Sequence, residues 1–464
     1  MKKLTLLRSF ALAIFLLYIN FAKSQSTFYR GADLSYVNEM EDCGVVYQEN
    51  DKAKDVYGIF SDNGCNLVRI RLWHSPKWYD ALNQGKRYSD LKDVTKSIAR
   101  AKANNMQVLL DFHLSDNWAD PSKQLVPAAW LNVVNDLPKL QDSLYNYIYN
   151  TLQSLASKDL LPDMVQIGNE TNRGILLSPE DNSHWTLDWT RNAALFNKAI
   201  QAVRKVEQER GQHIEVVLHM AAPAEIKPLL DGFLSHGVVD FDVIGISYYW
   251  AWHKPTTIAQ TGQIVKELKT KNPDKKVIIV ETGYIWTTLS KDQASNIISE
   301  VHPQYSPASP TAQYNWLKDL TNTVKSNGGE GVVYWEPAWQ SSPCYTQWGR
   351  GSHQEHATFF DFNNKLITTG GIVWMRDGKT SSVKPIMKQQ PIFEIKDNSV
   401  SVTLDSAVDT MELRIFDPSG RMMKSLSFKS VNTAKISLQG LNSGIYFITA
   451  YLSGGLAASY KVMI

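Results

Sequence analysis

The stretch DMVQIGNE, from Asp163 to Glu170, decides the fold of this chain. It is an apolar run, Met164 to Ile167, that ends in Gly168, Asn169 and an acid. A second stretch, KVIIVETGY at 276–284, repeats the pattern and places Glu281 at the end of another apolar run. Short continuous apolar runs of this kind are typical of strands buried on both faces. Two such strands that each end in Glu require a common explanation.

Eight strand-like runs alternate with amphipathic segments across about 350 residues. The runs are YRGADLS (29–35), NLVRIRLW (66–73), MQVLLDFH (106–113), MVQIGNE (164–170), IEVVLHM (214–220), DVIGISYY (242–249), KVIIVETGY (276–284) and GVVYWEP (331–337). Helical periodicity occurs at 94–104, 136–157, 192–209, 259–270 and 310–326. This alternation predicts an α/β fold, a (β/α)8 TIM barrel. The alternative is a doubly wound sheet, which normally has a glycine-rich turn after its first strand, and the sequence has none there.

A barrel explains the two acids, because active sites of this fold lie at the carboxyl ends of the strands. Polar and aromatic residues collect at those ends: Trp73, His74, His113, Asn169, Glu170, His219, Tyr248, Tyr249, Glu281, Trp335 and Glu336. Arg69 and Arg71 share one face of the second strand, where carboxylates must hold them, since an unpaired charge is costly in a dry core. Arg71 is nearer the strand end, so we expect it to be the better site candidate.

Two carboxylates at strand ends, in an aromatic-rich groove, suit glycoside hydrolysis. One acid would protonate the leaving oxygen, and the other would attack the anomeric carbon or activate water. The alternative is that each Glu is a structural ion-pair partner, for example of Arg69 or Arg71. We favour the catalytic interpretation, because both acids end strands and one follows Asn169.

Composition is consistent with a glycan as the partner. The chain carries a formal charge of +2, and the segment 1–24 contains four basic residues and no acid, so the remainder is slightly acidic. Such a surface argues against nucleic acid. There are 14 Trp and 20 Tyr, many of them just after strands, and aromatic faces stack on the apolar faces of sugars. Core packing is the alternative role for these rings.

The other motifs are weaker. The loop DFHLSDNWADP at 111–121 is rich in polar groups and fits sugar binding, with His113 as a hydrogen-bonding residue rather than a metal ligand. Phosphate-binding, dinucleotide and serine-nucleophile motifs do not occur, so no cofactor is expected. Asp292 and Asn296 follow the seventh strand and could bind calcium, but alternating acids are missing, which favours a solvated loop.

The two ends of the chain predict export. Residues 1–24 combine a basic start, an apolar stretch and a small-x-small site at Ala22 to Ser24, which predicts a signal peptide. No later stretch has the length of a transmembrane helix. We expect the barrel at 25–377, a linker at 378–390 and a small all-β sandwich at 391–464, where short strands alternate with turns such as DPSG and LNSG.

Three cysteines are too few for a disulfide scaffold. Cys43 follows the first strand and Cys344 follows the eighth, and these strands are neighbours where the barrel closes. Cys65 precedes the second strand and so lies at the opposite end. We therefore predict a Cys43–Cys344 disulfide with Cys65 free.

Eight motifs, in order from about residue 29 to 375, resemble glycoside hydrolase family 53. They are GADLSYVNEME, RIRLWHSP, DFHLSDNWADPSKQ, VQIGNETNRGILL, IGISYYWAWH, VIIVETGY, YSPASPTAQ and VVYWEPAW. The resemblance implies a retaining endo-β-1,4-galactanase of clan A, with Glu170 as acid/base and Glu281 as nucleophile. It implies that Asn169 holds the sugar 2-hydroxyl. It also implies that Arg71, His113, Tyr248 and Trp335 line the subsite and that Asp116 and Trp118 contact the chain nearby. Tyr249 is a further substrate-binding candidate from its place at the strand end.

One departure concerns metal. Family members with calcium carry closely spaced Asp, His and Asn after strand seven, whereas this sequence reads TTLSKDQASNIISE at 287–300. We therefore expect no required cofactor. The tail, MELRIFDPSGR through the C-terminus, resembles the sorting domain of type IX secretion substrates, and its few aromatics argue against a carbohydrate-binding module.

The sequence thus predicts a secreted or cell-surface monomer. It would act on β-1,4-galactan, such as pectic side chains or type I arabinogalactan, and would meet the secretion machinery through its tail. A β-mannanase or endoglucanase of the same clan is the alternative enzyme. A glycan-binding barrel without catalysis is the alternative from another class.

Overall fold

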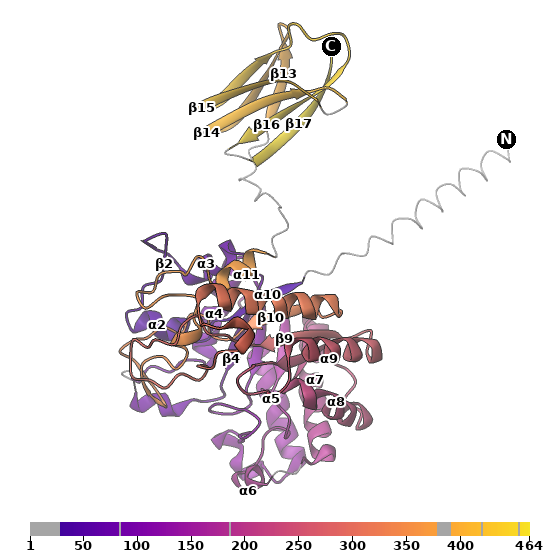
Figure 1. Cartoon of the computed structure of the whole chain (residues 1–464). Coiled ribbons are helices and arrows are strands. Elements are labelled where there is room, and N and C mark those ends of the chain that lie inside the picture. Colours follow the sequence, from indigo (N-terminus) through magenta and orange to yellow (C-terminus); the bar gives the residue numbers. More distant parts are fainter. Residues whose placement is uncertain (1–27, 83–84, 185–186, 378–390, 419–420, 453–454) are drawn as a thin grey trace, which may run out of the picture. The chain divides into compact units, whose positions relative to one another are not determined.

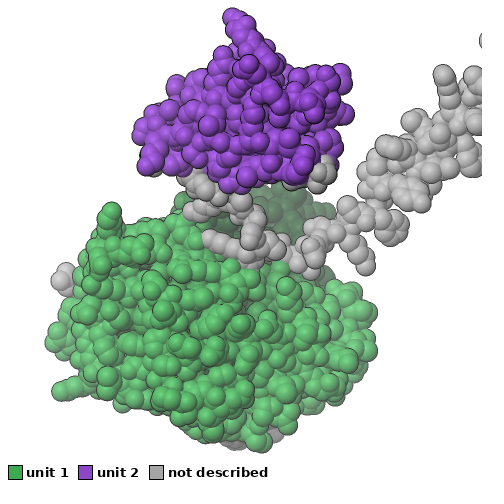
Figure 2. Space-filling view, turned by 45° about the horizontal axis from the view of Figure 1, so that its top comes forward, with its two compact units in different colours: residues 1–378 green, residues 379–464 purple. Residues whose placement is uncertain are grey.

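The computed structural model describes residues 28–82, 85–184, 187–377, 391–418, 421–452 and 455–464. The chain forms two compact units, residues 1–378 and 379–464 (Figure 2). The expected signal peptide at 1–24 and the linker at 378–390 lie outside the described residues.

The larger unit contains a closed barrel of eight parallel strands, as the alternation of runs predicts (Figure 1). Each strand pairs with its neighbour in chain order, and β1 pairs with β10 to close the ring. The strands are β1 (Tyr29–Asp33), β4 (Leu67–Leu72), β5 (Gln107–Phe112), β6 (Met164–Ile167), β7 (Glu215–Ala221), β8 (Val243–Ser247), β9 (Lys276–Glu281) and β10 (Gly331–Tyr334).

Helices surround the barrel (Figure 1). One helix follows each strand: α3 (Val56–Asp62), α4 (Leu91–Ala103), α5 (Leu137–Ala156), α7 (Trp189–Arg210), α8 (Ile226–Ser235), α9 (Ile258–Lys271), α10 (Pro310–Ser326) and α11 (Gly371–Arg376). Shorter elements lie in the loops: α2 (Val37–Asp42), α6 (Pro179–Ser183), β2 (Gln48–Glu49), β3 (Lys52–Ala53), β11 (Tyr345–Thr346) and β12 (Gly349–Arg350).

Helix α5 shows why these segments fold as they do. The Asp136 side chain accepts from the Lys139 amide at its N-terminus, which satisfies a donor that the helix leaves free. Its apolar residues recur at three- and four-residue spacing, and Leu140, Leu144 and Ile148 are fully buried. This face stabilises the helix against the barrel.

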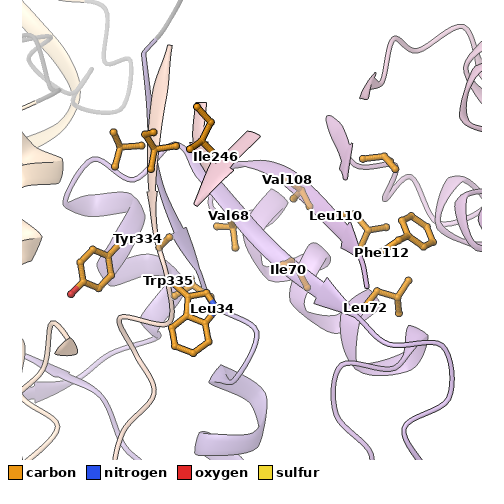
Figure 3. Close-up of a cluster of buried hydrophobic side chains, with 14 of the residues drawn as sticks. Leu34, Val68, Ile70, Leu72, Val108, Leu110, Phe112, Ile246, Tyr334 and Trp335 are labelled. Carbon is orange, nitrogen blue, oxygen red and sulfur yellow. The ribbon is translucent and has the colours of Figure 1, made fainter. Parts of the chain in front are cut away.

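Alternation along the strands separates two cores. On β4, Val68, Ile70 and Leu72 point outward and join the large cluster between strands and helices, together with the outward side chains of β5 (Figure 3). Leu67 points inward and belongs to a second, smaller cluster. That inner cluster consists of Tyr29, Leu67, Leu109, Met164, Val217, Val243, Ile278, Val280 and Val333. The inner face of the barrel is therefore apolar at the start of the strands and, as shown below, polar toward their ends.

The cysteine prediction is confirmed. Cys43 and Cys344 form a disulfide with a Cα–Cα distance of 5.7 Å. Cys65 is free and buried. The disulfide joins the loops that follow β1 and β10, which are adjacent at the barrel closure.

The smaller unit is all-β, as expected, but its strands join differently. It contains β13 (Ile392–Lys396), β14 (Ser399–Phe416), β15 (Met422–Ser437), β16 (Ile445–Leu452) and β17 (Gly455–Met463) in one hydrogen-bonded sheet. The expectation of short strands separated by turns is wrong for two apolar segments, VSVTLDS at 400–406 and MELRIFD at 411–417. Both belong to β14, whose register against β15 shifts between Thr403 and Val408, so an irregularity replaces a turn.

No helix in the described part of the chain has both the length and the apolar character that crossing a membrane requires.

Candidate active site

The end of β6 turns sharply to present Glu170. Gly168 has φ of +75°, and a Cβ there would lie 2.6 Å from the Thr171 side chain, so only glycine fits. Glu170 itself has φ of 47°, a left-handed conformation that is uncommon for residues other than glycine. Strained backbone of this kind is frequent at functional sites. The local sequence GNE therefore places the carboxyl over the barrel rather than continuing the strand.

Arg69 lies at the centre of the polar half of the barrel. Its Nη1 is 2.9 Å from Asp33 Oδ2, and its Nη2 is 2.7 Å from Asp111 Oδ2. The same Nη2 also donates to Asn169 Oδ1 at 2.7 Å, while Nη1 lies 2.8 Å from Glu281 Oε1. Arg69 is 1% exposed. Arg69 is thus a buried cation that contacts Glu281 directly and also contacts Asn169, the residue before Glu170.

Glu281 has a second partner at the end of β8. The Tyr249 hydroxyl donates to Glu281 Oε2 at 3.1 Å. Both carboxylate oxygens of Glu281 therefore have donors, Arg69 on one and Tyr249 on the other. Donors on both oxygens favour the ionised form and fix the orientation of the carboxylate.

Arg71 lies one step nearer the strand end and has unfilled bonding capacity. Its Nη1 donates to Glu336 Oε1 at 3.1 Å, and its guanidinium lies over the rings of three aromatics at 4.2 to 4.8 Å. These are Tyr36, Trp73 and Trp118. Its Nε and Nη2 are buried and have no hydrogen-bond partner among the described residues. Unpaired buried donors are costly, so this guanidinium is suited to a ligand oxygen.

The expectation that Arg71 matters more than Arg69 is only half right. Arg69 contacts Glu281 and Asn169, whereas Arg71 contacts Glu336 and the aromatic wall. Both arginines share one strand face, and their side chains are long enough that distance from the strand end does not decide what each reaches. The alternative role expected for a strand-end Glu, an ion pair with an arginine, is also observed, because Glu281 pairs with Arg69.

Tyr248 and Tyr249 point to opposite sides of β8. Tyr249 faces Glu281, but the Tyr248 hydroxyl donates to the Thr256 carbonyl at 2.9 Å, and its ring stacks on Trp316 of α10. The prediction that Tyr248 lines the site is therefore wrong. Successive strand residues alternate, and the inward series on β8 is Val243, Gly245, Ser247 and then Tyr249.

Asn169 retains a donor for a ligand. Its Nδ2 donates to the Ala119 carbonyl at 2.8 Å, and its Oδ1 accepts from Arg69. One of the two Nδ2 hydrogens is left, and the side chain is held rigidly. This arrangement is compatible with the expected contact to a sugar hydroxyl.

His113 and Asp116 support the loop after β5. His113 Nδ1 accepts from the Ala119 amide at 3.2 Å, and its Nε2 lies 3.0 Å from Asp111 Oδ2, so both nitrogens have protein partners. Burial lowers the His113 pKa, which keeps the ring neutral. Asp116 accepts from the amides of Ser75 at 2.9 Å and Ala128 at 2.8 Å. Each residue therefore positions the loop that carries Trp118, with both His113 nitrogens taken up by protein partners and the Asp116 side chain partly exposed.

Three rings form one wall of the site. Trp118 lies edge-on to Trp335, with 6.0 Å between ring centroids. Trp118 also stacks on Trp348, at 5.3 Å and an interplanar angle of 24°. Trp348 is 45% exposed, unlike the buried Trp335. The wall thus runs from the interior of the barrel to its surface, and it contains both Trp118 and Trp335.

Several members of the polar layer were not among the predicted site residues. Gln166 accepts from Arg69 Nε at 3.2 Å and donates to Asp111 Oδ1 at 2.7 Å. Asp33 and Ser247 also belong to the layer. A usable signal was present, because each is a polar residue at an inward position of a strand whose earlier inward residue is apolar.

Hydrogen bonds join the loops that follow β9 and β10. Among the described residues, no group of three or more His, Cys, Asp or Glu side chains is placed to bind a metal ion. Asp292 accepts from the Ala294 amide at 2.7 Å, the Ser352 amide at 2.8 Å and the Ser341 hydroxyl. Asn296 accepts from the His356 amide at 2.9 Å. Asp292 and Asn296 thus lie in a largely exposed loop, as expected, and in addition both join the two loops.

Burial raises the pKa of both Glu170 and Glu281. At Glu281 the Arg69 charge and the Tyr249 hydrogen bond oppose this rise. At Glu170 the Glu281 charge adds to it. Burial and the Glu281 charge therefore favour the protonated form of Glu170, whereas Arg69 and Tyr249 favour the ionised form of Glu281. Burial raises the pKa of Glu170 more than the Glu281 charge does, and only the folded structure reveals how deeply the acid is buried.

A closed barrel with two unequal buried carboxyls at strand ends, beside an aromatic wall, defines a glycoside hydrolase site. Residues 29–369 match glycosyl hydrolase family 53. The chain belongs to that family.

Individual relatives support the family assignment. An arabinogalactan endo-β-1,4-galactanase of Cellvibrio japonicus is 47% identical over 340 residues, which is 73% of this chain and 88% of that protein. An endo-β-1,4-galactanase of Bacillus subtilis is 36% identical over 67% of this chain and 70% of its own length. Among solved structures, the family 53 catalytic domain of Ignisphaera aggregans is 33% identical, with a TM-score of 0.67, over 76% of this chain and 98% of that one.

The smaller unit also has a family. Residues 396–464 match the secretion system C-terminal sorting domain. The tail is therefore a sorting domain, which supports secretion of the protein.

Proposed function

We propose that the protein is a secreted endo-β-1,4-galactanase that cleaves galactan and type I arabinogalactan with retention of configuration. Glu281 acts as nucleophile and Glu170 as acid/base. The observation that carries this assignment is the asymmetry of the pair: Arg69 and Tyr249 hold Glu281 from both oxygens, while Glu170 lies in the same buried site.

The reaction follows from these placements. Glu281 attacks the anomeric carbon while Glu170 gives its proton to the leaving oxygen, and a glycosyl ester forms on Glu281. The ester removes the negative charge of Glu281, so the pKa of Glu170 falls. Glu170 then takes a proton from water, which attacks the same carbon and releases Glu281.

Binding of the sugar chain is assigned to the remaining site residues. Asn169 and Arg71 offer donors to the hydroxyls of the sugar at the cleavage point, and Trp335 and Trp118 offer apolar faces. Beyond Trp348 a cavity of about 770 Å³ opens between the loops after β9 and β10, lined among others by Asp292, Arg350 and His353. It gives room for more distant sugars of a polymer. The proposed catalysis requires no cofactor.

The substrate assignment draws support from the Cellvibrio japonicus and Bacillus subtilis relatives, whose names specify galactanases. A digest of linear β-1,4-galactan, β-mannan and cellulose, with products sized over time, tests it. We expect galactan alone to be cut, first into long and then into short oligomers. Cleavage of mannan or cellulose instead would favour another clan A glycanase, and binding without cleavage would favour a silent barrel.

We further propose that the tail directs export and takes no part in catalysis, so that the active form is a monomeric barrel outside the cell. Deleting residues after 384 should leave the rate on galactan unchanged and retain the enzyme inside the cell envelope of its native host. Normal export of the shortened chain would refute the sorting role. Gel filtration of the purified enzyme checks the monomer.

A further inference from the structure

A side chain from the neighbouring loop holds the strained turn that presents Glu170. Gln124 lies on the loop after β5 and is 3% exposed. Its Nε2 donates to the Asn169 carbonyl at 2.8 Å and to the Glu170 carbonyl at 3.2 Å. The same Nε2 donates to the Asp120 carbonyl, in its own loop, at 3.0 Å. Nothing in the proposed reaction yet uses Gln124.

The orientation of the Gln124 amide is fixed by its neighbours. All the groups that its Nε2 contacts are carbonyl oxygens, which accept hydrogen bonds and cannot donate them, so the NH2 group must face them. The Gln124 backbone is anchored as well. Its N–H donates to Asn182 Oδ1 at 2.8 Å, and its carbonyl accepts from the Leu177 amide at 2.8 Å. The side chain therefore projects from a backbone that is held on both sides.

These contacts fix the backbone at Glu170. The angles φ and ψ of a residue describe how the peptide planes on its two sides are turned about its Cα. Gln124 contacts the carbonyl of the plane before the Glu170 Cα and the carbonyl of the plane after it. His219 Nδ1 accepts from the amide of the first plane at 3.2 Å, so that plane is held at both ends. A left-handed conformation such as that of Glu170, with φ of 47°, persists only where its surroundings enforce it.

We propose that Gln124 is a positioning residue that keeps the Glu170 carboxyl where it exchanges protons with the leaving group and with water. Without the Gln124 donor, the two peptide planes turn toward a less strained conformation, and the carboxyl moves with them. Both proton transfers then slow, because each needs the carboxyl within hydrogen-bond reach of the reacting oxygen. Attack by Glu281 is spared, since Arg69 and Tyr249 hold that carboxylate. This inference rests on the proposed role of Glu170 as acid/base.

The first test compares two aryl β-galactobiosides that fill the same sugar subsites and differ only in their leaving group. Gln124→Met in the full-length enzyme keeps the length of the side chain and removes the donor. With phenol as leaving group, which needs acid assistance, kcat/KM should fall about 10- to 100-fold. With dinitrophenol, which needs little assistance, kcat/KM should fall by less than about threefold. The ratio of the two values cancels any loss of folded enzyme.

Azide provides the second readout, because it opens the glycosyl ester without a base, whereas water needs Glu170. With the dinitrophenyl substrate, kcat of Gln124→Met should fall about tenfold, and azide should restore it and give the β-azide. Tyr249→Phe is the matched control, because it removes a donor from Glu281 instead. It should lower kcat/KM on both aryl substrates by similar factors and gain little from azide.

Equal losses on the two substrates, no loss on either, or a kcat that azide does not restore would overturn the inference. If Gln124→Met does not fold, Gln124→Asn, whose amide is one carbon shorter and stops short of the same carbonyls, is judged by the same criteria.

Failure of this inference differs from failure of the proposed function. If Glu170→Ala shows the selective loss and the azide rescue but the Gln124 variant shows neither, only the Gln124 role is wrong. If Glu170→Ala itself shows neither, the acid/base assignment is wrong.

Discussion

Glu170 and Glu281 occupy equivalent places at the ends of β6 and β9, yet their neighbours differ. A buried arginine and a tyrosine hold the Glu281 carboxylate, whereas Glu170 has a strained backbone whose amide donates to His219 Nδ1. Within the described residues, no lysine or arginine forms an ion pair with Glu170. The fold thus brings two identical side chains together, and their partners make one a nucleophile and the other an acid.

Truncating the two acids gives the largest effect and the clearest contrast. On galactan, Glu281→Ala and Glu170→Ala should each cost about 10⁴-fold or more in kcat/KM. An aryl β-galactobioside with a good leaving group needs little acid assistance, so on it Glu170→Ala should retain a burst of phenol release while Glu281→Ala shows none. Stopped-flow absorbance measures the burst. A burst in Glu281→Ala alone would reverse the assignment.

Replacing Arg69, the cation beside Glu281, should have the second-largest effect on activity. Arg69→Lys keeps the charge but loses the forked geometry that reaches Glu281, Asn169 and Asp111, so kcat/KM should fall about 10²-fold. The pKa of Glu281 should rise with the loss of its donor, and because the nucleophile must be ionised, the acid limb of kcat/KM should move to higher pH.

Arg71→Lys is the matched control for Arg69→Lys, because Arg71 pairs with Glu336 rather than Glu281. It should raise KM and leave the acid limb in place. If Arg71→Lys moves that limb and Arg69→Lys does not, the contrast between the two acids rests on the wrong arginine.

The two adjacent tyrosines provide a smaller test. Tyr249→Phe removes one donor from Glu281 and should lower kcat about tenfold. Tyr248→Phe removes a bond to the Thr256 carbonyl instead, so it should lower the free energy of unfolding by about 1 kcal/mol and leave kcat unchanged. Urea unfolding and initial rates on galactan separate the two. Equal kcat losses would mean that both rings face the substrate.

Trp348 should have the smallest effect on the chemistry, because it touches neither acid. Its stacking on Trp118 and its 45% exposure place it where a distant sugar would lie. Trp348→Ala should raise KM on long galactan about three- to tenfold and leave an aryl galactobioside and both pH limbs unaffected. A shifted limb would show that the aromatic wall also shapes the surroundings of the acids.

The sequence predicts the barrel and both acids because they depend on local signals. Apolar runs with a polar end mark strands, and parallel strands place those ends together. The features that the sequence did not reveal depend on how deep in the barrel each side chain ends and on which way it points. Arg69 and Arg71 share a face, so only the packed structure shows which one reaches Glu281.

Some of the missing information was available in the alternation of residues. Counting inward positions on β8 from Val243 selects Tyr249 over Tyr248. The role of Asp292 was not available, because it accepts from the amide of Ser352, sixty residues later, and no local pattern indicates such a contact. The irregular β14 was hidden for a similar reason, since β15 determines where it bends.

The most direct test of the unequal pair is the anomeric form of the azide products. An aryl β-galactobioside with a good leaving group is supplied with azide to Glu281→Ala and to Glu170→Ala, and proton NMR reads the configuration of each product. Without its nucleophile, Glu281→Ala should let azide attack directly and give the α-azide. Glu170→Ala should still form the ester on Glu281, which azide opens to the β-azide. Reversed anomers would contradict the account, because the two glutamates would then have exchanged roles.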